Sequence, residues 1–490
     1  MHRLAIVPRR QPEPSAAGLE RIARLASGIL AAEPRIGEVE PFGPNVRQGL
    51  GEGMAIFLGD AAEIRLLSVP GEVHHDYRLV WLARSGDTAV IGGPASAEFE
   101  DYQRQTLGEP GVRYLHVETE RNGIRRPAPI VCLKEESVYR HLCGICSGQD
   151  DITLMPHIST GTIWGLAAQL ARDTGARVNV AGSPPLLTRR VNDKLWFGDI
   201  VSRLLGAAAI PEKRSAFCGS ALVRHVIDLG GKWDRLVLKV PDSAGSAGNV
   251  LVQIEELRGL RPGEVLAELR ARVDTLGAGI PYPLAVEVWD ANVLSSPSAQ
   301  LWIPRPEDGP PLFEGIYEQI LEGEQKAFAG AAMAMLPPDL EEVFSVQAME
   351  IAVLFQKLGY FGRCSFDAIL TGPSIEKARI LWVECNGRWG GVSIPMSLVN
   401  RLPERDRFAA HVIVQEKGLE ERPLRFAVAR RIVEEYERER NGDIQLILLS
   451  PGVLEAGRGV HLLVRAATRE AALETSREVM ARLRAAGQIG

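Results

Sequence analysis

The residue types best suited to chemistry gather in two apolar stretches joined by a turn-rich segment, CSFDAIL (364–370) and ILWVECN (380–386). Both stretches are expected to be strands of one β-hairpin, in which alternate side chains share a face. Glu384, Asn386 and Arg388 then lie on one face, and Asp367 of the partner strand can join them. Two carboxylates and an amide supply the hard oxygen ligands of Mg²⁺, whereas a Zn²⁺ site would usually offer His or Cys. The alternative is a polar face that is only solvated, which the run Glu-x-Asn-x-Arg followed by two glycines makes harder to accept.

A glycine-rich loop earlier in the chain follows the strand-like stretch that ends near Lys239. Backbone N–H groups of such a loop can approach phosphate closely because no Cβ intervenes, and a neighbouring lysine supplies a mobile charge. The loop alone would equally suit an ordinary turn, since glycine is common in loops. Lys239 beside it favours phosphate binding by the loop residues Ser243, Gly245, Ser246, Ala247 and Gly248.

The order of these features resembles the ATP-grasp superfamily, whose metal-binding hairpin ends in Glu-x-Asn-x-Arg. That family places a lysine on the helix that opens the domain, a second lysine before a glycine-rich loop, and a glutamate on the strand entering the adenine hinge. Lys194, Lys239 and Glu287 occupy these places in the expected order. The resemblance implies that the hinge consists of Val288, Trp289 and Asp290. It covers residues 186–400.

The resemblance implies ATP and Mg²⁺ as cofactors, with the metal ligands Asp367, Glu384 and Asn386 neutralising the β- and γ-phosphates. A carboxylate substrate would attack the γ-phosphorus, giving an acyl phosphate and ADP, and an amine would then displace phosphate to leave an amide. Arg388 is expected to stabilise the developing negative charge because guanidinium is planar, permanently charged and bidentate toward phosphate. Arg363, earlier on the first strand of the hairpin, is a second catalytic candidate.

A finer resemblance involves residues 85–108 and 457–472, which are similar to the pre-ATP-grasp and C-terminal domains of pheganomycin-type peptide ligases. These enzymes join a nonproteinogenic amino acid to a peptide. The implied partners are therefore a small-molecule carboxylate, such as an amino acid or modified amino acid, and an amine or peptide, as in natural product biosynthesis. The alternatives are an ATP-grasp carboxylase or kinase-like enzyme, or a nucleotide-binding module without turnover. The complete hairpin set counts against the last.

The predicted fold class is α/β, and a chain of 490 residues is expected to form several domains. Residues 1–75 are unassigned apart from one helical stretch at 19–32. Residues 76–185 alternate strands and helices as a Rossmann-like pre-ATP-grasp domain, beginning with YRLVWLA (77–83) as a strand. Residues 186–400 are expected to form a two-subdomain α+β ATP-grasp fold, and residues 401–490 a small C-terminal α+β domain.

Composition limits the partners. The formal net charge of −6 argues against broad attraction to nucleic acid. The chain has no apolar run of the roughly 18 residues that a membrane helix needs, and its start is a poor signal peptide, so a cytoplasmic protein is expected. Superfamily analogy makes a homodimer plausible.

Several remaining polar or reactive side chains are expected to have no functional role. Six cysteines are too few for a disulfide framework, and Cys143-x-x-Cys146 lacks the further ligands of a zinc site. Cys385 is expected to be a small buried residue on the opposite face of its strand. The adjacent His74 and His75 are expected to be solvated.

Overall fold

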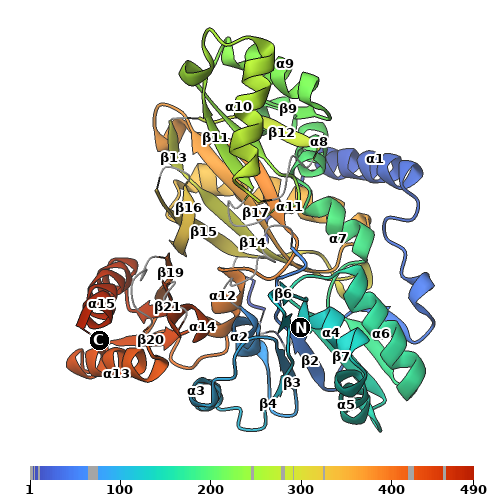
Figure 1. The fold of residues 1–490 in the computed structure, drawn as a ribbon, viewed down its shortest axis with the longest axis vertical. Helices are drawn as coiled ribbons and strands as arrows, with labels where there is room; N and C mark the ends of the chain where they lie inside the picture. The colour runs from blue at the N-terminus through green and yellow to red at the C-terminus, as the bar shows by residue number, and fades with distance from the viewer. Residues whose placement is uncertain are drawn as a thin grey trace.

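Three main sheets and the helices around them make up the protein (Figure 1). The computed structural model describes residues 4, 6–8, 11–64, 75–243, 248–277, 282–290, 292–323, 326–417, 424–455 and 459–489. No helix within these ranges is both long and apolar enough to cross a membrane.

The first sheet has six parallel strands in the order β1-β8-β7-β2-β3-β4. Their bounds are Val46–Gln48 (β1), Ala55–Leu58 (β2), Thr88–Ile91 (β3), Arg113–His116 (β4), Asp151–Pro156 (β7) and Arg177–Val180 (β8). The associated helices are Ala97–Leu107 (α3), Ala128–Lys134 (α4), Glu136–Cys146 (α5) and Gly161–Thr174 (α6), and β5 (Glu120–Arg121) and β6 (Ile124–Arg125) form a separate hairpin. Strands β2 and β3 are buried along their whole length, as expected for a parallel sheet with covered faces. The direction of strand addition reverses between β2 and β7, which makes this pair the topological switch point of the sheet.

Two findings revise the expected start of this domain. Strands β1 and β2 come from the first 75 residues, which the sequence pattern left unassigned. The prediction of a strand over residues 77–83 is wrong: the segment forms α2 (Asp76–Leu79) and a 3₁₀ turn over Val80–Leu82. A short apolar run that is buried on every side has no periodicity that separates strand from helix. Trp81 in this stretch is fully buried, and its Nε1 donates to the Leu449 carbonyl at 2.9 Å, so a partner far along the chain holds the segment in place.

The second sheet has four antiparallel strands in the order β11-β10-β12-β9 and lies at the top of Figure 1. Its strands are Lys213–Ala216 (β9), Arg235–Lys239 (β10), Asn249–Gln253 (β11) and Leu284–Val288 (β12). Helices α9 (Gly219–Gly230) and α10 (Pro262–Asp274) pack together with these strands in one apolar core. Helices α7 (Pro185–Val191) and α8 (Lys194–Leu205) precede this lobe.

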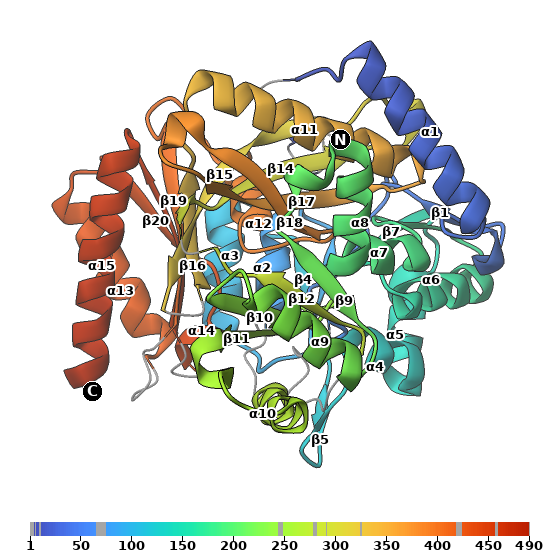
Figure 2. The same cartoon turned by 90° about the horizontal axis from the view of Figure 1, so that it is seen from above.

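The third sheet has nine antiparallel strands and runs from the centre of the molecule to its C-terminal end. Its strands are Val293–Ser295 (β13), Pro297–Ile303 (β14), Leu312–Glu322 (β15), Ala327–Met333 (β16), Gly362–Thr371 (β17), Arg379–Asn386 (β18), Ala410–Lys417 (β19), Ile444–Leu448 (β20) and Gly459–Ala466 (β21). The remaining helices are Ala16–Ala32 (α1), Pro338–Lys357 (α11), Ser393–Val399 (α12), Phe426–Glu439 (α13), Gly452–Glu455 (α14) and Arg469–Ile489 (α15). Figure 2 shows α1 beside α11, and α13 and α15 against the strands β19 to β21. The C-terminal strands therefore continue the central sheet.

Candidate active site

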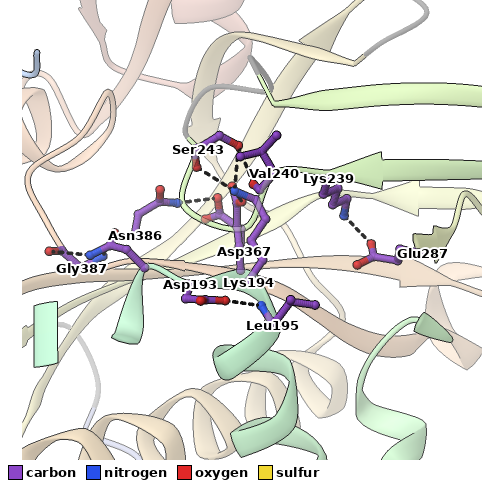
Figure 3. Close-up of polar contacts among 12 residues, drawn as sticks. Asp193, Lys194, Leu195, Lys239, Val240, Ser243, Glu287, Asp367, Asn386 and Gly387 are labelled. Atoms are coloured by element: carbon purple, nitrogen blue, oxygen red, sulfur yellow. Dashed lines mark hydrogen bonds and ion pairs between the residues drawn. The ribbon is translucent and has the colours of Figure 1, made fainter. Parts of the chain in front are cut away.

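The hairpin of β17 and β18 brings the predicted metal ligands together. Asp367 lies opposite Glu384 and Ser365 lies opposite Asn386, so the two carboxylates and the amide share one face, as the alternation predicts. Asn386 Nδ2 donates to Asp367 Oδ2 at 2.9 Å, and Ser298 Oγ of β14 donates to the other carboxylate oxygen at 2.6 Å (Figure 3). Both donors come from neighbouring strands, so the sheet itself orients the carboxylate of Asp367.

The two carboxylates of this hairpin titrate differently. Burial, followed by the neighbouring negative charge of Glu384, raises the pKa of Asp367 to about 7. Burial also tends to raise the pKa of Glu384, but Lys194, Lys239 and Arg388 outweigh it and hold that pKa below its ordinary value. Two carboxylates that repel each other inside a protein form a favourable place for a divalent cation.

Asp367, Glu384 and the amide oxygen of Asn386 fit Mg²⁺, because all three offer hard oxygen ligands. Nowhere in the described ranges do three His, Cys, Asp or Glu side chains converge as a metal site. A cation here would therefore complete its shell with phosphate oxygens and water, which is the usual manner of Mg²⁺.

Lys194 connects the four-stranded lobe to the hairpin. It is the first residue of α8, whose N-terminus is capped by Asp193 through a hydrogen bond from Leu195 N at 2.8 Å. Its Nζ donates to the Ser243 carbonyl at 2.7 Å and lies 3.0 Å from Glu384 Oε2. Only 7% of the Lys194 side chain is exposed, so this is not the ordinary surface lysine that its residue type would suggest.

Lys239 and Glu287 form a buried ion pair across β10 and β12. Lys239 lies opposite Ala285, so its side chain shares a face with Glu287 two residues further on. The pair faces the same region as Lys194 (Figure 3). Each of these charged side chains has its burial offset by an opposite charge.

The described ends of the glycine-rich loop are held tightly. Ser243 Oγ donates to the Val240 carbonyl at 2.8 Å, and Val240 N donates to the Gly248 carbonyl at 2.9 Å. A Cβ at position 248 would lie 2.1 Å from Ser243 Oγ, so only glycine fits there. The predicted phosphate-contacting residues Gly245, Ser246 and Ala247 lie outside the described residues.

The predicted hinge begins at Val288, the last residue of β12. Val288 N donates to the Glu212 carbonyl at 3.0 Å, and Trp289 N donates to the Arg235 carbonyl at 3.1 Å. Asp290 Oδ1 accepts a hydrogen bond from Asn292 N at 2.8 Å. The N–H groups of Val288 and Trp289 are thus engaged within the lobe, and Asp290 orders the turn.

Arg388 belongs to the site, and a residue that sequence reasoning missed positions it. Its guanidinium donates to Asn386 Oδ1 and to Asn192 Oδ1, and the same Asn192 oxygen accepts from Gly387 N at 3.1 Å. Asn192 comes directly before Asp193, the residue that caps α8. Its place one residue before a helix cap is the only signal that the sequence offers for it.

Arg363 is not brought into the cluster of metal ligands. Its side chain is 1% exposed and forms an ion pair with Glu314 of β15. The guanidinium also lies 4.9 Å from the centre of the Trp389 ring. Its catalytic assignment stays a prediction, and its contacts are those of a residue that orders the core.

The remaining candidates lie apart from the metal ligands or take supporting positions. All six cysteines are free thiols, and buried Cys385 lies with its sulfur 3.5 Å from that of Cys364. Cys143 and Cys146 lie on α5. His74 lies outside the described residues, whereas His75 stacks on His461 with ring centres 5.4 Å apart.

Comparisons with known proteins agree with this architecture. A family model described as the pre-ATP-grasp domain matches residues 76–172. An N5-carboxyaminoimidazole ribonucleotide synthetase in complex with ADP is similar with a TM-score of 0.51 at 13% identity, over 90% of this chain and 99% of that one. The Staphylococcus aureus N5-carboxyaminoimidazole synthetase with ADP gives 0.52 at 10% identity, over 89% and 100%.

The biotin carboxylase domain of the Hydrogenobacter thermophilus 2-oxoglutarate carboxylase gives a TM-score of 0.52 at 11% identity, over 87% of this chain and 89% of that one. No curated protein matches by sequence. At such identities the likeness shows the fold. The predicted fold class, an ATP-grasp architecture preceded by a Rossmann-like pre-ATP-grasp domain, is confirmed.

Proposed function

We propose that this protein is an ATP-dependent carbon-nitrogen ligase that joins a carboxylate to an amine and releases ADP and phosphate. The observation that supports the proposal is the bridge from Ser243 through Lys194 to Glu384, which connects one end of the glycine-rich loop to a candidate metal ligand. ATP would lie between the two antiparallel sheets, with its phosphates near Lys194 and Lys239.

The residues act mainly by positioning and by charge. Mg²⁺ held by Asp367, Glu384 and Asn386 would neutralise phosphate charge. A carboxylate oxygen of the acid attacks the γ-phosphorus, and the bond to the β-phosphate oxygen breaks to release ADP. The amine nitrogen then attacks the acyl carbon, the bond to phosphate breaks, and the nitrogen loses a proton. Arg388, oriented by Asn192 and Asn386, would stabilise the negative charge in both steps.

For the substrates we propose an amino acid or modified amino acid as the acid and an amine or peptide as the acceptor, as in pheganomycin-type peptide ligases. Residues 85–108, which carry part of that resemblance, lie inside the matched residues 76–172. This supports the assignment of the N-terminal domain. The substrate class then rests on the resemblance.

A carboxylase is the second candidate, because the similar structures include biotin carboxylases and one of these was determined with bicarbonate. Bicarbonate would then be the carboxylate that accepts the phosphoryl group. Turnover that requires bicarbonate and needs no other acid would favour this function. A tight ATP complex with no turnover under any acceptor would instead favour a silent nucleotide-binding module.

The test is an ADP-release screen in which the protein is incubated with ATP, Mg²⁺, candidate acids and candidate amines. We expect ADP and phosphate to appear only when both substrates are present, with an amide detected by mass spectrometry. Release of AMP and pyrophosphate would contradict the mechanism.

Two variants test the site itself. Glu384→Gln and Lys239→Ala are expected to lower turnover by at least about a hundredfold while the fold is kept, since each removes a charge aimed at the phosphates. Exposed Glu376 on the turn of the same hairpin and exposed Lys232 on the same lobe offer the controls Glu376→Gln and Lys232→Ala. Wild-type rates in Glu384→Gln and Lys239→Ala would dismiss the site.

A further inference from the structure

Arg78 on α2 is buried but has no acidic partner among the described residues. Arg78 is 8% exposed, and its Nε has no hydrogen-bond partner. Burial alone lowers its pKa to about 10. A buried arginine is normally paired, because removing an unpaired charge from water is costly.

The surroundings of Arg78 are themselves basic. His157 follows β7, and burial together with the charges of Arg388, Arg78 and His75 holds its pKa well below the ordinary value. His75 in turn stacks on His461 of β21. We call Arg78, His157 and Arg388 the junction cluster, because they come from the parallel-sheet domain and from the end of the hairpin.

The nearest acids of the parallel-sheet domain have other partners. Asp76 lies two residues before Arg78, but its Oδ2 accepts from Gly92 N at 2.6 Å. Asp60 pairs with Arg125 at 3.0 Å and accepts from Ala128 N at 2.7 Å. The positive charge of Arg78 is therefore not offset by these two carboxylates.

The cluster lies where an open parallel sheet usually binds ligands. His157 comes directly after β7, and its N–H donates to the carbonyl of Leu58 at the end of β2, at 2.8 Å. These strand ends flank the switch point, outside which ligands of such sheets bind. Trp389 N donates to the His157 carbonyl at 3.0 Å, which ties this edge to the residue after Arg388.

Gly391 lies close to the guanidinium of Arg78. A Cβ built at this position would lie 3.1 Å from Gln415 Oε1, 3.1 Å from Phe328 Cε1 and 3.5 Å from Arg78 Nη2. The glycine follows Arg388 by three residues, so the segment after the hairpin packs against the Arg78 side chain of α2. An added methyl group would press on these three neighbours.

We propose that Arg78, His157 and Arg388 bind the reactive carboxylate of the acid substrate. Arg78 can offer two parallel N–H donors to a carboxylate, and neutral His157 can donate one hydrogen bond without adding a third full charge. Arg388 is shared with the phosphate side, so the bound carboxylate would lie next to the transferred phosphoryl group. That the bound anion is the acid substrate rests on the proposed function. That these residues bind an oxyanion does not depend on it.

The test measures anion binding to the whole protein without nucleotide, using acetate, glycine and inorganic phosphate as probes in calorimetry. We expect Arg78→Gln to weaken the response to acetate at least tenfold and Gly391→Ala to weaken it to a smaller degree. Arg172→Gln, an exposed arginine of the same domain with 70% of its side chain accessible, is the matched control and should bind like the wild type. No response to any probe in the wild type, or an equal response in Arg78→Gln, would overturn the proposal.

Two further measurements distinguish binding of the acid from binding of the γ-phosphate and from a purely structural role. If the cluster holds the acid, Arg78→Gln binds Mg²⁺-ADP and a non-hydrolysable ATP analogue within twofold of the wild type, whereas a clear loss of ATP-analogue binding would assign the cluster to the γ-phosphate. Arg78→Gln should also unfold at the same or a higher temperature without anion. Failure to fold, or a fall of several degrees, would show a structural role and reject the proposal. Anion binding stays measurable even if no ligase activity is found.

Discussion

Arg363 and Arg78 are both buried arginines, but only Arg363 forms an ion pair with a carboxylate of the described residues. Arg363 pairs with Glu314 inside the central sheet and is flanked by the Trp389 and Trp302 rings at 4.9 and 5.7 Å. Arg78 is buried, and it forms no ion pair with a carboxylate of the described residues. Removing one member of a buried ion pair is costly because the other charge is left uncompensated, whereas an unpaired buried charge can be compensated by a bound ion of opposite sign. The difference separates a structural arginine from a binding arginine of the same burial.

The largest expected effect comes from breaking the internal pair. Arg363→Met would leave the buried carboxylate of Glu314 uncompensated, and such a loss costs about 3–5 kcal/mol. Denaturant unfolding followed by fluorescence measures it. The double variant Arg363→Met/Glu314→Gln should recover most of that stability, because both charges are then gone. A loss below about 1 kcal/mol in the single variant would remove the contrast with Arg78.

The pH dependence of stability shows whether the buried charges of Asp76 and Arg78, both on α2, act independently. Burial and, after it, the negative charge of Asp60 raise the pKa of Asp76 to about 7. Between pH 4 and pH 7 the folded protein therefore keeps a proton on Asp76 that the unfolded chain has released. Its contribution to stability is therefore complete below pH 4 and is lost as the pH rises toward 7, at up to about 1.4 kcal/mol per pH unit. Asp76→Asn should flatten the stability curve between these limits.

The same pH series in the Arg78→Gln background provides the control for Asp76. If Arg78 offset the charge of Asp76, removing it would raise the pKa of Asp76 further and move the decline to higher pH. An unchanged curve is expected.

Lys194→Met should give a smaller effect that appears in nucleotide binding. The substitution removes the positive charge between Ser243 and Glu384, and we expect Mg²⁺-ADP affinity to fall about tenfold, or about 1.4 kcal/mol. Stability should change less than in Arg363→Met, because Lys239 and Arg388 still act on Glu384. Calorimetric titration with Mg²⁺-ADP measures the affinity, with Lys232→Met as the control. Unchanged affinity would argue that Lys194 only joins the two sheets.

Local sequence predicted the hairpin because a strand places every second side chain on one face. The spacing of Glu384 and Asn386, with Asp367 on the partner strand, gives a shared face in any well-paired hairpin. The start of α8 followed from a local signal too, since Asp193 caps the helix that carries Lys194. Both features depend on short stretches of the chain: two strands joined by one turn, and a cap residue beside its helix.

The residues after position 76 show where local patterns stop being informative. The stretch 77–83 is apolar enough for a buried strand or a buried helix, and its surroundings made it helical. Arg363 shows the same limit for a side chain, because its place on β17 was predictable but its pairing with Glu314 was not. Glu314 lies 49 residues before Arg363, and no spacing pattern in the sequence connects the two.

The sequence by itself determined the order of the phosphate loop, the lysines and the hairpin, because each is encoded by short-range spacing and strand alternation. Only the tertiary structure decided that Arg78, His157 and Arg388 lie near one another, since the end of a parallel strand, a short helix and a hairpin end are brought together by sheet packing. The tertiary structure also decided that Arg363, and not Arg78, forms an ion pair with a carboxylate. Burial and the distance between charges are properties of the folded chain, and they separate the candidate nucleotide site from the candidate acid site.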